Sequence, residues 1–259
     1  SALGLGLYET STNGAQARLG VPLTDIDTVM LGLGYEDTSI TEFEGAPLRI
    51  TSYVTTFGSS NTTVLGTVGW GRDTRDSAIY PTSGATTRAG LESGLPGGSL
   101  RFYKVSAEHK RYIPLTSYFT LYANVEAGYG NGYNGLPLPF FRNFYSGGPT
   151  SVRGFYPGTI GPKDANGDPT GGNTKLVGNL ELLFPFPGLP NDKSIRVSAF
   201  VDGGIIGSNY SFANGDASAG IAVLYVSAFG PLKVSFAQPV KTQVGDRTQK
   251  VQFQFGQSF

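Results

Sequence analysis

Apolar and polar residues alternate along most of this chain with a period of two, which predicts β-strands with one apolar and one polar face. In residues 115–128, Leu121 and Ala123 alternate with Thr120, Tyr122 and Asn124. About twelve such segments recur, most of them near the ~9 to 11 residues that a tilted strand needs to cross a bilayer. The predicted strands are 2–9, 15–22, 28–36, 62–72, 85–93, 100–112, 115–128, 174–184, 194–202, 217–226, 231–238 and 249–259.

The connections between these segments alternate in length. Short turns are predicted at 11–14 and 23–27, whereas the long links 38–61, 129–173 and 203–216 all fall on one side if the first strand runs outward. The first long link has a segment, 46–57, that favours a short helix. Long loops on one side and short turns on the other are typical of a transmembrane β-barrel. We therefore predict an all-β, antiparallel transmembrane barrel that occupies residues 1–259 as a single domain.

Composition supports many short strands, since the chain has 38 glycines, 12% aromatic residues and only 15% charged residues. No stretch approaches the ~20 consecutive apolar residues of a spanning helix, and the N-terminus lacks the features of a signal peptide. A soluble β-sandwich is the alternative, because its strands also alternate. Charged residues that recur opposite the apolar face favour a barrel with a wet lumen; they are Lys104, Glu126, Glu181 and Asp202.

Charge and chemistry exclude several functional classes. The formal net charge is zero, so nucleic-acid binding is not expected. There is no cysteine, and the only histidine, His109, falls on the apolar side of its strand, which disfavours a hydrolase. Residues 164–168 resemble half of a calcium loop, but Pro169 stands where glycine is needed and Lys175 where the closing glutamate is needed. We expect no enzyme activity, no metal and no cofactor.

The stretch 140–161 interrupts the β pattern and is rich in aromatic residues around Arg153. Such a composition indicates a loop in an enclosed place, where an unpaired charge would cost several kcal/mol. Strand parity puts Glu181 and Asp202 on the inward face of the strands that follow. A guanidinium fork suits two carboxylates, so we expect Arg153 to pair with them. The alternative is a solvated surface arginine.

Three segments resemble sequences of known families. Val152-Arg153-Gly154-Phe155, preceded by the sequence NFYSGG at 143–148 and followed by Ile160-Gly161-Pro162, resembles the sixth-loop signature of the BamA family of outer-membrane protein assembly factors. The C-terminal strand, which ends on an aromatic residue, resembles the β-signal by which outer-membrane barrels are recognised; its matching residues are Val251, Phe253, Phe255, Gly256 and Phe259. Residues 217–239 also resemble the last hairpin of that family.

The resemblance implies a truncated C-terminal portion, about twelve strands, of a sixteen-strand barrel that follows soluble periplasmic modules. It implies that loop 129–173 folds into the lumen and that Arg153 is anchored to Glu181 and Asp202. The implied function is insertion of nascent outer-membrane proteins at a seam between the first and last strands, in the bacterial outer membrane. Implied partners are membrane lipids, nascent chains and, through the missing modules, the lipoproteins of an assembly complex. Without these modules and the first strand we expect little insertion activity, and exposed edge strands favour dimerisation. The alternative function is a channel or secretion pore.

Overall fold

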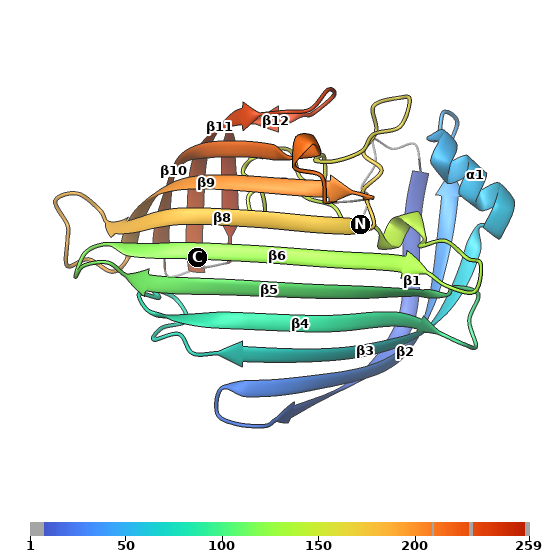
Figure 1. Cartoon of the computed structure of the whole chain (residues 1–259), viewed down its shortest axis with the longest axis horizontal. Coiled ribbons are helices and arrows are strands. Elements are labelled where there is room, and N and C mark those ends of the chain that lie inside the picture. The colour runs from blue at the N-terminus through green and yellow to red at the C-terminus, as the bar shows by residue number, and fades with distance from the viewer. Residues whose placement is uncertain (1–7, 209, 228–229, 257–259) are drawn as a thin grey trace.

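A computed structural model describes residues 8–208, 210–227 and 230–256. Eleven strands form one antiparallel sheet in chain order (Figure 1). They are β1 (Tyr8–Pro22), β2 (Asp27–Glu42), β3 (Ser60–Asp73), β4 (Gly84–Leu95), β5 (Phe102–Pro114), β6 (Thr120–Gly132), β8 (Thr174–Pro185), β9 (Ile195–Gly207), β10 (Asp216–Ser227), β11 (Gly230–Lys241) and β13 (Val251–Phe255). The short strands β7 (Gly154–Phe155) and β12 (Thr248–Gln249) pair with each other apart from this sheet.

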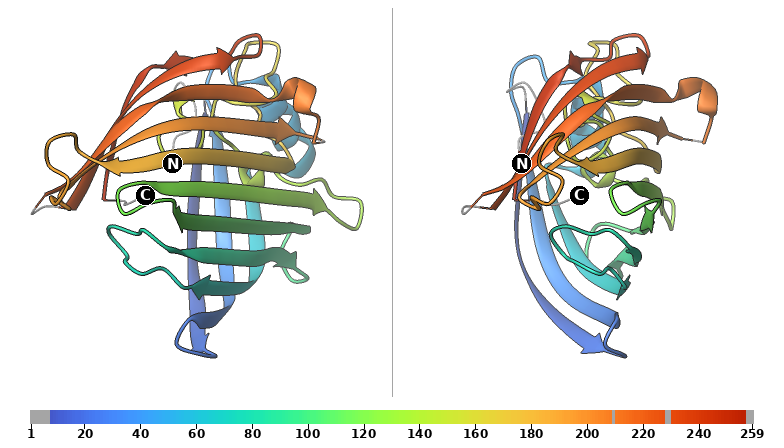
Figure 2. Two further views of the ribbon diagram at one scale, coloured as in Figure 1. Left: turned by 60° about the vertical axis from the view of Figure 1, so that its left-hand side comes forward. Right: turned by 90° about the vertical axis from the view of Figure 1, so that its left-hand side faces the viewer.

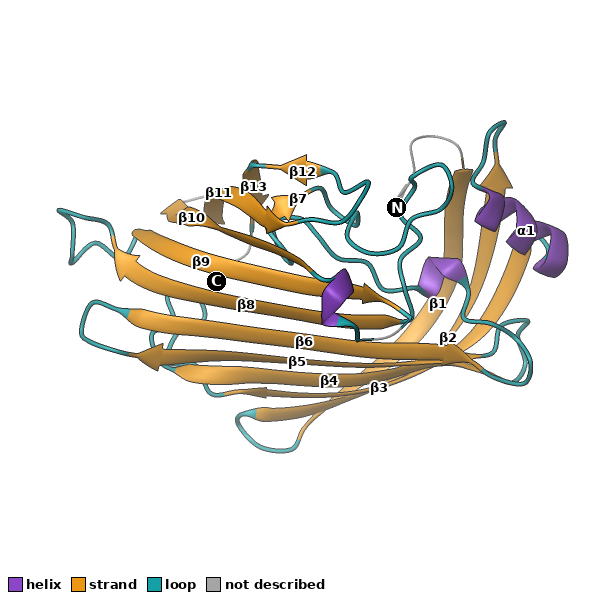
Figure 3. Cartoon of the chain, turned by 45° about the horizontal axis from the view of Figure 1, so that its top comes forward, coloured by secondary structure: helices purple, strands orange, loops and turns teal. Residues whose placement is uncertain are grey.

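The sheet curls strongly (Figure 2), and its outer, convex face is apolar. One row of side chains crosses β2, β3, β4 and β5, where Leu31, Val68, Leu91 and Val105 are cross-strand partners and all are exposed. The inner, concave face is polar and partly covered by the β6–β8 loop, which lies inside the curve (Figure 3). This is the polarity of a barrel sheet, so the predicted fold class is confirmed. A sandwich would instead bury its apolar face.

The N-terminal strands differ from the sequence pattern. The predicted turn 11–14 lies inside β1, because β2 continues past Glu36 to Glu42 and supplies a partner to each of these residues. Ser11 lies opposite Ser39, and Asn13 lies opposite Asp37. Two predicted strands are therefore one long strand, most of whose predicted first part, 2–9, lies outside the described residues. The residues 11–14 carry no alternation, and their pairing depends on partners 22 to 28 residues away.

The long connections gather at one end of the sheet, as predicted. They contain α1 (Leu48–Phe57), η1 (Phe140–Arg142) and η2 (Phe212–Asn214). Helix α1 has no side-chain cap at Pro47, and it is held instead by burial of Ile50 and Tyr53. In the described part of the chain, no helix combines the length and the apolar character that crossing a membrane requires.

Apolar packing inside the curve comes from the β6–β8 loop rather than from the strands alone. One cluster joins Ile40, Ile50 and Tyr53 to Phe140 near the N-terminal strands. A second cluster joins Val152, Phe155 and Ile160 of the loop to Val177 and Ile206 of β8 and β9. The loop thus packs on both halves of the sheet.

Candidate functional site: the buried loop

The motif Val152-Arg153-Gly154-Phe155 is buried on the concave face. Val152 and Phe155 are fully buried, and Val152 fills the space that a side chain at Gly204 would occupy. Gly154 has φ of +89°, and a Cβ there would lie 3.2 Å from the Cβ of Ala237 on β11. Only glycine adopts this left-handed conformation without strain. The sequence therefore allows the backbone to lie directly on β10 and β11.

Arg153 meets both carboxylates that strand parity places on the inner face. Its backbone N–H and its Nε donate to Asp202 Oδ2 at 3.0 and 2.7 Å, and its Nη2 donates to Asp202 Oδ1 at 2.8 Å. Its Nη1 donates to Glu181 Oε1 at 3.1 Å. The guanidinium also lies on the Phe200 ring, 3.3 Å from its centroid, in cation–π geometry. Desolvation alone would lower the pKa of Arg153, but these bonds and charges raise it, so the side chain stays charged.

The buried charges balance. Glu181 Oε1 also accepts from Lys233 Nζ at 3.3 Å and from the Ser198 hydroxyl. Two cations, Arg153 and Lys233, therefore face two anions, Glu181 and Asp202, and all four are less than a tenth exposed. Buried charges are tolerated when they are paired and hydrogen-bonded in this way.

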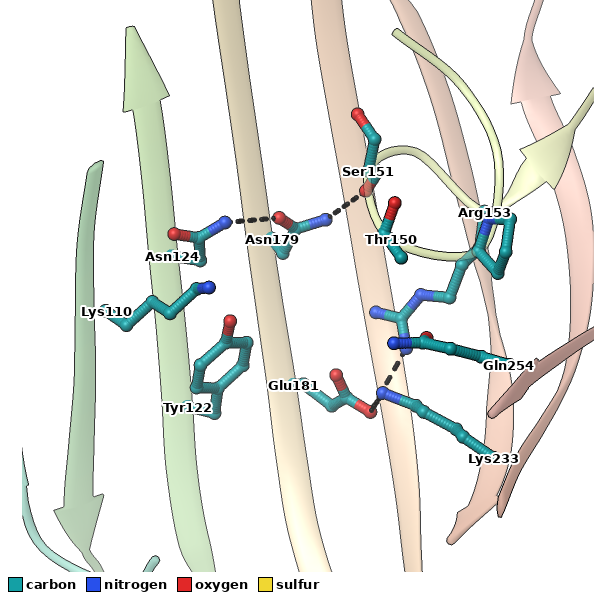
Figure 4. Close-up of a pocket in the computed structure, with 11 residues that line it drawn as sticks. Lys110, Tyr122, Asn124, Thr150, Ser151, Arg153, Asn179, Glu181, Lys233 and Gln254 are labelled. Carbon is teal, nitrogen blue, oxygen red and sulfur yellow. Dashed lines mark hydrogen bonds and ion pairs between the residues drawn. The ribbon is translucent and has the colours of Figure 1, made fainter. Parts of the chain in front are cut away.

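Amide side chains extend the network across the sheet (Figure 4). Asn124 Nδ2 donates to Asn179 Oδ1 at 2.9 Å, and Asn179 Nδ2 donates to the Ser151 carbonyl at 2.7 Å and to Asp202 Oδ1 at 2.8 Å. A polar cavity of about 70 Å³ adjoins Arg153 and is lined by Lys110 and Tyr122 among others. The network joins β6, β8 and β9 to the residue that precedes Val152.

The C-terminal strand is joined to the motif through one side chain. Gln252 of β13 accepts from the Gly154 N–H at 3.2 Å and donates to the Phe155 carbonyl at 2.7 Å. Next to it, Val251, Phe253 and Phe255 point to the exposed outer face, and Gly256 N–H bonds to the Pro231 carbonyl at 2.9 Å. Phe259 lies outside the described residues. The two signatures seen in the sequence are therefore in direct contact.

Three side chains of this site escape the sequence pattern. Parity places Lys233 and Gln252 on the inner face, but nothing in the sequence relates them to the motif. Arg142 lies in the same stretch as Arg153 and pairs with Glu36 and Glu92 on the opposite half of the sheet. Aromatic neighbours in the sequence indicate that a charge is enclosed, and Arg142 has such neighbours as well as Arg153.

The site offers no arrangement for metal chemistry. Among the described residues, no group of three or more histidine, cysteine, aspartate or glutamate side chains is placed to hold a metal ion. Both carboxylates of the motif network are engaged by cations. His109 lies on an exposed strand, where its Nδ1 is 2.8 Å from the Thr87 hydroxyl. The arrangement can hold a loop in place.

The sequence matches a known family and a curated relative. Residues 6–259 match the Omp85 superfamily domain. The chain is 36% identical over 292 residues to the outer membrane protein assembly factor BamA of Neisseria meningitidis. This alignment covers 97% of this chain and 37% of that protein. The chain thus spans little more than a third of this curated relative.

Solved structures share the fold of this chain. BamA from Haemophilus ducreyi lacking POTRA domains 1–3 superposes with a TM-score of 0.88 at 28% identity, over 95% of this chain and 54% of that chain. CdiB from Acinetobacter baumannii superposes with a TM-score of 0.61 at 12% identity, over 94% of this chain and 41% of that chain, a likeness of fold alone.

Proposed function

Because this chain belongs to the Omp85 superfamily, we propose that it is the C-terminal part of an assembly factor that inserts nascent β-barrel proteins into the bacterial outer membrane. The observation that carries the proposal is the joined pair of signatures. The Val152–Phe155 motif is bonded to β8, β9 and the edge strand β13 through Arg153, Gly154 and Phe155. These hydrogen bonds join a charged loop to the edge strand, which supports a role for this edge.

We propose that the edge of β13 is where an incoming strand is paired. Among the described strands the sheet order ends at β13, so the described part of the chain supplies a partner strand on one side of β13 only. Strand addition at such an edge gives affinity through main-chain hydrogen bonds. Gln252, which holds the motif, limits the motion of this edge strand from its inner side.

The proposed partners follow from the two faces. Lipid acyl chains cover the apolar convex face, and nascent outer-membrane proteins meet the β13 edge. Lipoprotein subunits of an assembly complex would bind modules that lie outside this chain. None of these roles includes a covalent step, so the proposed function is not enzymatic.

The first test is engagement of a substrate. The chain contains no cysteine, so a single cysteine can be introduced at Phe253 of the edge strand or at Val105, an equally apolar outer position on the fully paired strand β5. Each variant in liposomes is mixed with an unfolded outer-membrane protein that carries one cysteine in its last strand. We expect disulfide cross-linking at position 253 and little at position 105.

Other outcomes separate the alternatives. Equal cross-linking at both positions would sink the edge-pairing proposal. Cross-links between two copies of the chain at position 253 would indicate dimerisation through this edge. Ion conductance of the same liposomes without substrate cross-linking would favour a channel or secretion pore.

A further inference from the structure

A second arginine anchors the loop on the half of the sheet opposite Arg153. Arg142, at the end of η1, bonds through Nη2 to Glu36 of β2 and through Nη1 to Glu92 Oε1 of β4 at 3.1 Å. Its guanidinium carbon lies 5.3 Å from the centroid of the Phe102 ring on β5. Arg142 therefore contacts three strands of the N-terminal half.

This cluster repeats the composition of the Arg153 cluster. Glu92 lies directly opposite Lys104 on β5, and both face inward. Each cluster thus has one loop arginine, two carboxylates from the sheet and one lysine from the sheet. The Arg142 cluster is wetter, because its arginine is 17% exposed and Glu36 and Glu92 are 20% and 32% exposed. It should therefore respond to salt, whereas the buried Arg153 cluster should not.

The loop has two limbs, which pack mainly on different halves of the sheet. The first limb, 140–146, packs on the N-terminal half, where Phe140 joins the cluster of Ile40, Ile50 and Tyr53, while its Phe144 also packs against the cluster of the second limb. The second limb, 152–160, packs on β8 and β9 through Val152, Phe155 and Ile160. Arg142 is the ionic anchor of the first limb, and Arg153 is that of the second.

We propose that Arg142 is a second positioning residue, which ties the first limb to Glu36 and Glu92 so that the loop braces the two halves of the curved sheet against each other. The idea deepens the proposed function, because a braced loop would couple the N-terminal half to the β13 edge. It concerns the loop itself, however, and can be tested without insertion activity.

Hydrogen exchange of backbone amides can be measured separately for the two limbs. Amides of the first limb, such as those of Asn143 and Phe144, bond to carbonyls of Phe140 and Gly172, and amides of the second, such as that of Tyr156, bond to the carbonyl of Arg247. In Arg142→Gln we expect exchange of 140–146 to rise about tenfold, since charge-assisted bonds are lost, with 153–160 unchanged. Arg153→Gln should give the reverse pattern. Arg18→Gln, an exposed change on β1, is the control.

Combined variants and the salt dependence of hydrogen exchange distinguish the loss of an ion pair from a simple loss of packing. Arg142→Lys keeps the charge and should restore part of the protection. Adding Glu36→Gln and Glu92→Gln to Arg142→Gln should raise exchange no further, because the partners act as one unit. In the unchanged protein, higher salt should raise exchange of 140–146 only, which tests the idea even if a variant does not fold.

The proposal is wrong if Arg142→Gln leaves 140–146 protected, or if both limbs loosen together in either variant. A protein that shows the expected exchange pattern but no cross-linking at the β13 edge would keep the brace and contradict the proposed function alone.

Discussion

At the scale of single residues, Arg153 makes three guanidinium hydrogen bonds and one backbone N–H bond to two buried carboxylates. Arg153→Gln would leave Asp202 and Glu181 buried with only Lys233 as a cation. We expect the free energy of unfolding to fall by about 3–5 kcal/mol, measured by urea titration of the folded barrel in detergent.

The double variant Arg153→Gln/Asp202→Asn removes one charge of each sign and should lose less stability than Arg153→Gln alone. Equal losses would mean that shape rather than charge pairing holds the arginine.

Gly154 tests backbone conformation separately from charge. Gly154→Ala should strain a residue at φ of +89° by about 1–2 kcal/mol and also press on Ala237. Gly167 is the matched control, because it has φ of +82° but no neighbour within 4 Å of the added Cβ. Limited proteolysis of the loop should therefore be faster in Gly154→Ala than in Gly167→Ala. Similar rates in the two would show that the contact with β11 does not matter.

At the scale of elements, α1 packs through two buried residues, Ile50 and Tyr53, and the second carries a phenol. Burial raises the pKa of Tyr53 to about 12, from the ordinary value of 10.0. A phenol that ionises later in the folded state than in the unfolded state contributes stability below pH 10, and this contribution is lost as pH rises from about 10 to 12. We expect exchange of the α1 amides to increase across that range.

Tyr53→Phe keeps the ring in the cluster and removes the titrating group. In this variant, exchange of the α1 amides should therefore rise with pH only as base catalysis requires. A rise beyond this that persists in Tyr53→Phe would place the titrating group elsewhere.

At the scale of the whole molecule, the convex face exposes apolar side chains and the concave face is polar and partly covered by the loop, and we propose that lipid covers the convex face. Val105 and Ser106 are adjacent on β5 and point to opposite faces. Val105→Lys should destabilise the membrane-inserted state by up to about 2–4 kcal/mol, with smaller values nearer the interface. Ser106→Lys should be tolerated, and the folded fraction in liposomes compares the two. Equal folding of both variants would contradict the membrane orientation.

Alternation in the sequence, together with the alternating loop lengths and the charges opposite the apolar face, predicted the fold class and the face of most strand residues, because a strand turns alternate residues to opposite sides. It also put Glu181 and Asp202 on the inner face, where the structure brings them to Arg153. These inferences need only local spacing and the rule that a buried charge requires partners.

The distances between Arg153, Glu181 and Asp202 are known only from the tertiary structure. Alternation says nothing of register, so the continuation of β1 through 11–14 follows from its partner β2. Arg142 meets Glu36 and Glu92 across 106 and 50 residues, and the path of a loop over a sheet sets that pairing. Long-range packing has no signature in a period of two, which is why the partners of the second anchor were visible only in the folded chain.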